Sequence, residues 1–291
     1  MEDLLRPIYQ ERASESGTLG IVIIEKMKPN SPITDNFDVI LLIIVSDDAK
    51  QDWFVKHYEL DDEKTAAMHI VEEKRLMEWI DTSGYRKAVE WVINGKVVFD
   101  RNGYIADLKN QLRTFPFEKR NLRKAMEFGK LVKSYNEVKE LHESNQLKDA
   151  YSRMVHSLHY LARLAVIEKG YHPEVTLWNQ VKQIDPEVYK LYEELIESEE
   201  DIEQRIKLMI LAADFAISTR AEVSAKHLLD IIRTKDAAWS YEELKQQPAV
   251  SPYVLDLAAM LMYLHEKGLL ETELAPTKGA GVYQLKYKSA L

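Results

Sequence analysis

Acidic residues lead directly into the most apolar stretch of this chain, a placement typical of sites that handle metal ions and phosphate. Asp35, Asn36, Phe37 and Asp38 precede seven consecutive apolar residues, 39–45, which predict a strand buried on both faces. Metal-dependent phosphoryl transfer needs two or three carboxylates on one site. Here the amide of Asn36 stands where a second carboxylate is required. We therefore expect Mg²⁺ to bind weakly or not at all, with Asp38 and Asp35 as its ligands.

A basic segment is the second candidate for chemistry. Residues 109–133 carry eight basic and two acidic side chains, a local net charge of +6 on a chain whose total is -9. Arg120, Arg123 and Lys124 form the densest cluster, and we predict that they bind phosphate groups through charge-assisted hydrogen bonds. The alternative is that this segment is the solvated face of a helix.

Arg153 and His159 have the spacing found in ribonucleases of the HEPN class, in which a histidine and an arginine cleave RNA by general acid–base chemistry. Six residues correspond to about 600° along a helix, so these two side chains lie on different faces. We expect His156 and His159 to pack at the surface of a helical bundle instead.

Composition restricts the function further. With 291 residues, 46% of them hydrophobic and 30% charged, the chain is long enough for two or three globular domains. Without cysteine it has no disulfide, thiolate zinc site or cysteine nucleophile. The net charge of -9 argues against nonspecific nucleic-acid binding, which requires an excess of Lys and Arg. Residues 39–45 are too short to span a bilayer and residues 1–10 do not form a secretory signal, so we expect a cytoplasmic protein with no membrane partner.

The elements that position these residues change type along the chain. Residues 1–115 alternate β-branched runs with turns and predict an α/β half, with one short helix at 73–80 and strands at 19–24, 39–45, 54–60, 66–71 and 97–99. Residues 116–224 show helical spacing throughout and predict a four-helix bundle, with helices at 117–139, 147–169, 186–196 and 206–216.

The last segment, residues 225–291, predicts a winged helix-turn-helix. Three helices are expected: the first at 226–233, the second after the N-cap Ser240, with Glu243 as its capping-box partner, and the third at 252–267. A hairpin formed by 269–274 and 282–287 follows them. The third helix is apolar on more than one face, which favours packing on protein, either its own chain or a second copy. DNA is the less favoured partner, and Lys278, Lys286 and Lys288 near the wing are the residues that support it.

The first half resembles the nucleotidyltransferase fold of the DNA polymerase β superfamily, particularly the kanamycin-type nucleotidyltransferases. That family has a strand ending in Gly-Ser, a loop, and an acidic motif that leads into a second strand, with a third carboxylate on a neighbouring strand. Residues 19–24 match the first strand, residues 35–40 match the second, and Asp38 falls on the second metal carboxylate. The resemblance implies a pair of Mg²⁺ ions that align a hydroxyl with a nucleoside triphosphate.

The sequence departs from this family at three positions. Asn36 replaces the first carboxylate, Glu25 and Lys26 stand in place of Gly-Ser, and residues 66–71 offer His69 in place of the third acid. Asp35 is one position too early, since side chains on a strand alternate between faces.

The resemblance extends over about 225 residues, because residues 95–104 and the bundle match the family's junction and substrate-binding domain. We therefore expect an α+β protein with a nucleotidyltransferase-like mixed sheet domain (1–115), a helical substrate-binding-like bundle (116–224) and a C-terminal winged helix-turn-helix (225–291).

The function favoured is that of a bacterial nucleotidyltransferase-like protein with a degenerate metal site, binding a nucleotide or another phosphate-bearing small molecule. The alternatives are an active transferase that uses Asp38, and a DNA-binding regulator whose first two domains sense a ligand. A homo-oligomer formed through the winged helix is a further expectation.

Overall fold

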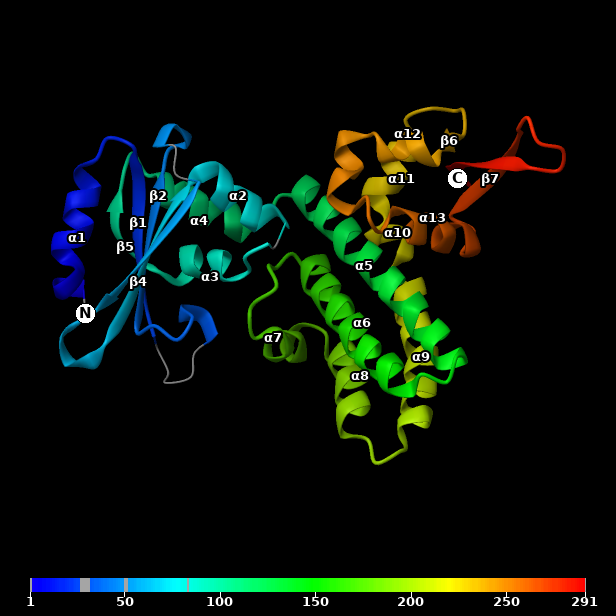
Figure 1. Cartoon of the computed structure of the whole chain (residues 1–291), viewed down its shortest axis with the longest axis horizontal. Helices are drawn as coiled ribbons and strands as arrows, with labels where there is room; N and C mark the ends of the chain where they lie inside the picture. The colour runs from blue at the N-terminus through cyan, green and yellow to red at the C-terminus, as the bar shows by residue number, and fades with distance from the viewer. Residues whose placement is uncertain (1, 27–31, 50–51, 83, 291) are drawn as a thin grey trace. The chain divides into compact units, whose positions relative to one another are not determined.

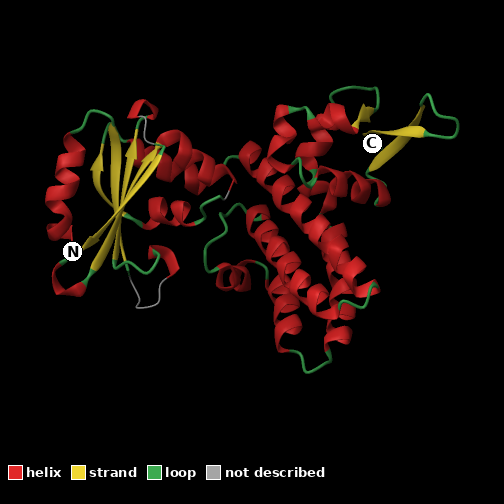
Figure 2. Ribbon diagram, viewed as in Figure 1, coloured by secondary structure: helices red, strands yellow, loops and turns green. Residues whose placement is uncertain are grey.

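The computed structural model describes residues 2–26, 32–49, 52–82 and 84–290, and the chain forms two compact units (Figures 1 and 2). The first unit consists of Met1–Pro116 and His172–Thr176, and the second of Phe117–Tyr171 and Leu177–Leu291. Helices and strands together confirm the α+β class. None of the helices in the described part of the chain is both long and apolar enough to cross a membrane.

The first unit is built on a five-stranded mixed sheet. The strands lie in the order β3-β4-β2-β1-β5, with β2 and β4 parallel and the other neighbouring pairs antiparallel. Their bounds are β1 Thr18–Glu25, β2 Val39–Val45, β3 Trp53–Glu59, β4 Thr65–Glu72 and β5 Lys96–Asp100. All five agree with the expected strands to within one or two residues, because each is a continuous run of residues that favour the extended conformation.

Helices cover both faces of this sheet (Figure 1). Helix α1, Glu2–Ser14, packs on one face through Leu5 and Tyr9. The opposite face is covered by α2 Glu73–Thr82, α3 Lys87–Asn94 and α4 Tyr104–Thr114. Short 3-10 turns lie at Pro32–Thr34, Asp47–Ala49 and Asp61–Glu63. All seven residues of β2 are buried because the strand lies between these two layers.

The strand register brings the ends of three strands together at one edge of the sheet, which is formed by the end of β1 and the starts of β2 and β4. Glu25, at the end of β1, pairs with Val39 at the start of β2, and Val39 pairs in turn with Ala66 near the start of β4. Asp35 and Asn36 enter this edge with left-handed φ values of 51° and 71°. The acidic motif therefore lies in a tight turn beside β4.

The second unit contains the predicted helical bundle. Four long helices pack around one core, and a short helix, α7, is added to them. Their bounds are α5 Phe117–Glu143, α6 Leu147–Glu168, α7 Leu177–Ile184, α8 Pro186–Glu197 and α9 Ile202–Ser218.

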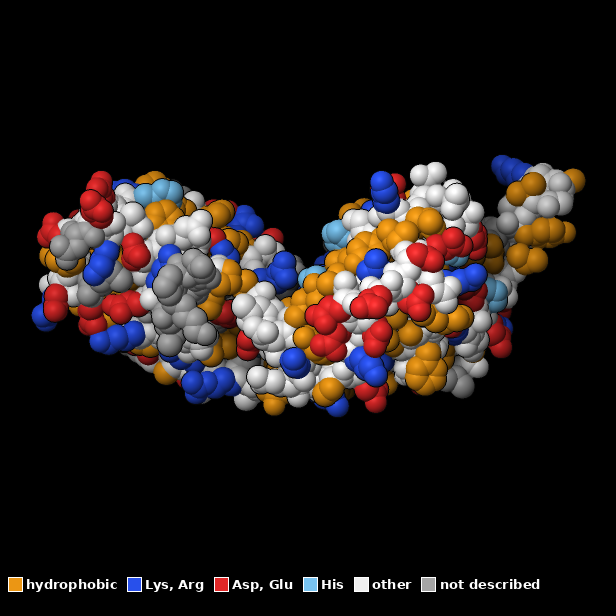
Figure 3. Space-filling model, turned by 90° about the horizontal axis from the view of Figure 1, so that it is seen from below, with side chains coloured by type: hydrophobic (Ala, Val, Ile, Leu, Met, Phe, Trp, Pro, Cys, Tyr) orange, Lys and Arg blue, Asp and Glu red, His pale blue; other side chains and the backbone are white. Residues whose placement is uncertain are grey.

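The winged helix-turn-helix follows in the same unit. Its elements are α10 Ala221–Ser224, α11 Lys226–Ile232, β6 Trp239–Ser240, α12 Tyr241–Lys245, a 3-10 turn at Pro248–Tyr253, α13 Leu257–Glu266, β7 Leu270–Pro276 and β8 Tyr283–Ser289. Ser240 and Glu243 form the expected capping box at the start of α12. The third helix starts later than predicted, because Pro252 lies in the 3-10 turn that precedes α13. The β7–β8 hairpin protrudes from the unit and has apolar side chains along it (Figure 3).

Helix α5 joins the bundle to the winged helix. It packs against α6 and α9 on the bundle side and against α11 and α13 of the winged helix. The approach to α13 is close, since a Cβ added at Gly129 would lie 2.9 Å from Met260 Sδ and 3.0 Å from Asp256 Cβ. The two segments expected as separate domains thus share one continuous hydrophobic core.

Candidate functional site

Asp38 is held by the first residue of the neighbouring parallel strand. Its Oδ2 accepts hydrogen bonds from Thr65 N at 2.8 Å and from Thr65 Oγ1 at 3.2 Å. These contacts lower the pKa of Asp38, with the backbone hydrogen bond contributing most and the charges of Lys26 and Lys64 adding to it. Asp38 is thus ionised at neutral pH, and one carboxylate oxygen already serves to cap β4.

Asp35 points to a different set of partners. Its Oδ1 forms an ion pair with Lys87 Nζ at the start of α3, and its Oδ2 accepts a hydrogen bond of 2.7 Å from the hydroxyl of Tyr85. Burial lowers the pKa of Lys87. The cation that meets Asp35 is therefore a lysine, and the two aspartates have no partner residue in common among these contacts.

The neighbouring strand β4 presents Thr65, Ala67 and His69 on the face where the resemblance implies a third carboxylate, and none of these is an acid. His69 is buried, and its Nδ1 accepts a hydrogen bond of 3.2 Å from Trp53 Nε1. Burial lowers the pKa of His69 to about 4, with a smaller contribution from His57. His69 is accordingly a neutral member of an aromatic cluster that includes Trp91.

The remaining motif positions also lack the family's chemistry. Asn36 is exposed, and Glu25, at the Gly-Ser position, is exposed at the end of β1. Within the described residues, no group of three His, Cys, Asp or Glu side chains is arranged to hold a metal ion. The residues present do not fit the pair of Mg²⁺ ions that the resemblance implies, because the carboxylates are too few and are engaged elsewhere.

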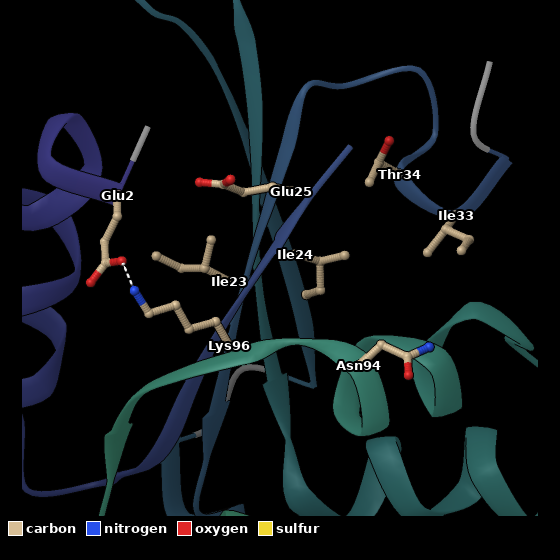
Figure 4. A pocket seen from close by; sticks show the side chains of 8 residues that line it. All are labelled: Glu2, Ile23, Ile24, Glu25, Ile33, Thr34, Asn94 and Lys96. Carbon is tan, nitrogen blue, oxygen red and sulfur yellow. Dashed lines mark hydrogen bonds and ion pairs between the residues drawn. The ribbon is translucent and has the colours of Figure 1, made fainter. Parts of the chain in front are cut away.

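A pocket of about 340 Å³ opens at this same edge of the sheet (Figure 4). Its walls come from the end of β1, the turn before Asp35, the end of α3 and the start of β5, and its lining residues are Glu2, Ile23, Ile24, Glu25, Ile33, Thr34, Asn94 and Lys96. Lys96 forms an ion pair with Glu2 across the pocket. Three isoleucines together with amide, hydroxyl and charged groups make a lining suited to a small molecule with both apolar and polar parts.

The basic cluster of α5 lies inside the second unit. Arg123 is 3% exposed and Lys124 5%, so these two residues do not form the solvated helix face that was the alternative interpretation. Lys124 Nζ donates a hydrogen bond of 3.0 Å to the carbonyl of Val223. Burial alone would raise the pKa of the carboxylate of Glu127, but the charges of Arg163, Lys130 and Arg123 outweigh this effect and lower it. Arg120, partly exposed and lying over the ring of Phe117, is the member of the cluster that a ligand can reach most directly.

Arg153 and His159 are engaged separately. Arg153 Nε forms an ion pair of 2.9 Å with Glu137, whereas His159 Nε2 accepts a hydrogen bond of 3.2 Å from Trp178 Nε1. His159 Nδ1 lies 3.1 Å from the carbonyl of Val155, which assigns the proton to Nδ1. With both ring nitrogens engaged, His159 packs in the bundle as expected and is not positioned for acid–base chemistry.

Thr65, Tyr85 and Lys87 are the site residues that the sequence did not reveal. Thr65 follows a loop, and Tyr85 and Lys87 are 50 and 52 residues away from Asp35 along the chain. A lysine at the first position of a helix carries no recognisable local signal. Had α3 been predicted, the opposite charges of Asp35 and Lys87 could have suggested an ion pair.

Comparison with known families divides the chain into three matched segments. Residues 1–120 match a family described as nucleotidyltransferase-like, residues 121–220 match the YgxA-like substrate binding domain, and residues 226–289 match a helix-turn-helix domain. These matches agree with the sheet domain, bundle and winged helix of the structure.

Two relatives match the whole length. The chain is 48% identical over 287 residues to YgxA of Bacillus subtilis (strain 168), covering 99% of this chain and 97% of that protein. The crystal structure of a nucleotidyltransferase-like protein from Exiguobacterium sibiricum 255-15 matches with a TM-score of 0.80 and 38% identity, covering all of both chains. With this identity over nearly its full length, the chain belongs to the family of YgxA-like, nucleotidyltransferase-like proteins.

Proposed function

We propose that this protein binds a nucleotide or another phosphate-bearing small molecule with its nucleotidyltransferase-like domain and does not transfer nucleotidyl groups efficiently. The proposal combines a fold that is shared with transferases and a set of side chains that differs from theirs. The description of residues 121–220 as a substrate-binding domain supports a small-molecule ligand. Mg²⁺ takes at most a weak part in this binding.

The observation that carries the proposal is the engagement of Asp38 by Thr65. A metal-binding carboxylate needs free oxygen lone pairs and a second carboxylate close by. Asp38 instead caps β4 through two hydrogen bonds, and Asn36 supplies a neutral amide beside it. A neutral amide binds Mg²⁺ more weakly than a carboxylate does, so the two-metal arrangement loses its main source of affinity.

Lysines supply positive charge at the same edge. Lys26 follows β1, Lys64 precedes β4, and Lys87 begins α3, where it is paired with Asp35. The charges of Lys26 and Lys64 are close enough to Asp38 to lower its pKa. Lysine ammonium groups attract phosphate oxygens without a metal ion. Lys26 and Lys64 are our candidates for phosphate contacts at the sheet edge, and Arg120 is a separate candidate in the second unit.

The test is calorimetric titration of the full chain with each nucleoside triphosphate, with and without Mg²⁺, while released pyrophosphate is measured in parallel. We expect binding that changes less than about threefold when Mg²⁺ is added, and no catalytic release of pyrophosphate. Turnover that depends on Mg²⁺ would contradict the proposal and establish the alternative, an active transferase that uses Asp38.

Paired variants identify the phosphate contacts. Charge-assisted contacts contribute about 1.5–3 kcal/mol each, so Lys26→Ala or Lys64→Ala should weaken binding about tenfold or more. Lys190→Ala, which removes an exposed lysine from α8, is the matched control and should leave the affinity unchanged. If Arg120→Ala weakens binding and the two lysine variants do not, the ligand lies at the basic helix and not at the sheet edge.

The helix-turn-helix match favours one alternative, a DNA-binding regulator that senses a ligand. The exposed positions of α13 are Ala258, Met262, His265 and Glu266, whereas readers of the major groove usually present Arg, Lys, Asn or Gln. Electrophoretic mobility of DNA fragments, measured with and without the nucleotide that binds, tests this alternative.

A further inference from the structure

Helix α9, Ile202–Ser218, is apolar on its inner face, as expected of a bundle helix. It packs against α5, α6 and α8 in the second unit (Figure 1). The buried residues of this face are Ile206, Met209, Ala213, Ala216 and Ile217.

The opposite face of α9 is apolar as well. Leu208, Leu211 and Phe215 are 45%, 69% and 72% exposed, and their spacing of three and four residues places them in one row. At 100° per residue this row, which we name the outer stripe, lies about 180° from the inner face. A surface helix normally carries polar residues there, and a helix that is apolar all round is normally buried. The outer stripe therefore lacks a covering partner among the described residues of the second unit.

Two opposite charges border the outer stripe on one side. Lys207 and Asp214 are seven residues apart, so they occupy equivalent positions two turns from each other along the same flank. Asp214 also contacts Lys267, the residue that follows α13, at 3.2 Å, and the side chain of Asp214 remains 45% exposed. The flank thus carries one positive and one negative group at the spacing of a heptad.

We propose that the outer stripe is the interface of a two-fold symmetric dimer in which α9 packs antiparallel to α9 of a second copy. An antiparallel arrangement places Lys207 opposite Asp214 of the partner subunit, and Asp214 opposite Lys207 of the partner subunit. A parallel arrangement would instead set this flank against the opposite flank of the partner helix, where neither charge would face the other. A two-fold interface uses the same patch twice, and this patch is complementary to itself in charge.

The oligomeric state of the full chain tests this proposal. Because the stripe is short, we expect a dissociation constant on the order of micromolar, and therefore a dimer that dissociates on dilution in sedimentation or light-scattering measurements. Leu211→Glu buries a charge in each half of the interface and should weaken the dimer about 100-fold or more. A wild-type chain that remains monomeric at about 100 μM would overturn the proposal.

Leu274→Glu separates this interface from one formed by the wing, because Leu274 on β7 is 64% exposed, close to the value for Leu211. The proposal requires a dimer that survives Leu274→Glu and is lost in Leu211→Glu. The reverse result would place the contact on the β7–β8 hairpin and would overturn the assignment to α9. Unchanged far-ultraviolet circular dichroism in both variants confirms that folding is not the cause.

Charge exchange tests the orientation of the helices. Lys207→Glu alone and Asp214→Lys alone each place like charges across the interface and should weaken self-association about tenfold. Mixing these two variants restores both opposite-charge pairs, so a heterodimer of wild-type affinity is expected. Lys190→Glu on α8 makes the same charge change as Lys207→Glu outside the interface and should leave the dimer intact. If both variants are folded and their mixture does not associate, the antiparallel arrangement is wrong.

Discussion

At the scale of single residues, Asp38 illustrates how a motif position can be retained while its chemistry changes. The carboxylate lies where the family resemblance implies, at the start of the central buried strand, but Thr65 occupies one of its oxygens. The neighbouring acid, Asp35, is neutralised by Lys87. The partners of these two acids are therefore a threonine, a tyrosine and a lysine of the same chain.

Replacement of Asp38 should therefore affect stability more than ligand binding. Asp38→Ala removes both hydrogen bonds to Thr65, and we expect the free energy of unfolding in urea to fall by about 1–2 kcal/mol. Asp38→Asn keeps an acceptor oxygen and should lose less than half of that. Nucleotide affinity measured by calorimetry should stay within about twofold for both variants. A large loss of affinity or turnover in Asp38→Asn would instead support the active transferase.

The metal prediction concerns the same edge. Crystals soaked in Mn²⁺ without nucleotide should show no pair of anomalous peaks about 3.5–4 Å apart near Asp38, the separation usual for two-metal sites. The physical reason is the small number of carboxylates present. Two peaks at that separation would refute the degenerate site, and one ion held jointly by Asp38 and phosphate oxygens would favour the active transferase.

His69 should make the stability of the first unit depend on pH. Burial depresses its folded-state pKa to about 4 from an unfolded value near 6.5, so the unfolded chain binds the proton more readily. The stabilisation is fully present above pH 6.5 and is lost as the pH falls to about 4. We expect a loss of about 2–3 kcal/mol over this range in wild type, which His69→Asn should remove. An NMR titration that gives His69 a pKa near 6.5 would contradict this.

At the scale of elements, the strands could be predicted because each forms a continuous run of suitable residues. Three helices of the first unit could not. Helix α1 contains Pro7 and buries only Leu5 and Tyr9 within its thirteen residues, so its apolar pattern is sparse. Helix α3 has eight residues, and α4 begins directly after the turn at Gly103. Short helices of this kind are stabilised by packing on the sheet, which the local sequence does not encode.

The basic helix α5 shows the same limit for charges. Its positive side chains resemble a solvated face in sequence, but charged residues of α5 form ion pairs with residues of other segments as well as within the helix. Arg163 of α6 reaches Glu127 at 2.8 Å, and Lys133 reaches Asp256 before α13 at 3.6 Å. Ion pairs between residues this far apart in the chain depend on the tertiary fold. The sequence therefore predicted where the positive charge of α5 lies but not which residues it contacts.

The close packing of α5 against α13 should require glycine at position 129. Gly129→Ala would normally stabilise a helix interior by about 1 kcal/mol. Here the added Cβ would lie 3.0 Å from Asp256 Cβ, which cannot move without shifting the backbone of the winged helix. We expect a net loss of about 1 kcal/mol in thermal or urea unfolding because overpacking outweighs helix propensity. A gain of about 1 kcal/mol would show that this contact is loose.

At the scale of the whole molecule, the bundle and the winged helix form one physical unit although they match separate families. Their shared core includes Phe128 of α5 and Tyr263 of α13, whose rings pack edge to face. The apolar character of α13 that was visible in the sequence is explained by this second contact, with α5 of its own chain. Because the winged helix shares this core, it is not a separate DNA-binding module joined to the bundle by a flexible linker.

We predict that the winged helix does not bind duplex DNA with submicromolar affinity. Residues 226–291 carry eight basic and eight acidic side chains, which removes the electrostatic attraction that dominates nonspecific binding, and the chain's net charge of -9 opposes it further. One face of α13 is buried and the exposed one offers Ala258, Met262, His265 and Glu266. Fluorescence anisotropy with a random 30-base-pair duplex, measured from about 50 to 200 mM salt, should show weak binding with a shallow salt dependence. Tight, salt-sensitive binding that Lys278→Ala weakens and Lys190→Ala does not would place the wing on DNA and make the ligand-sensing regulator the favoured function.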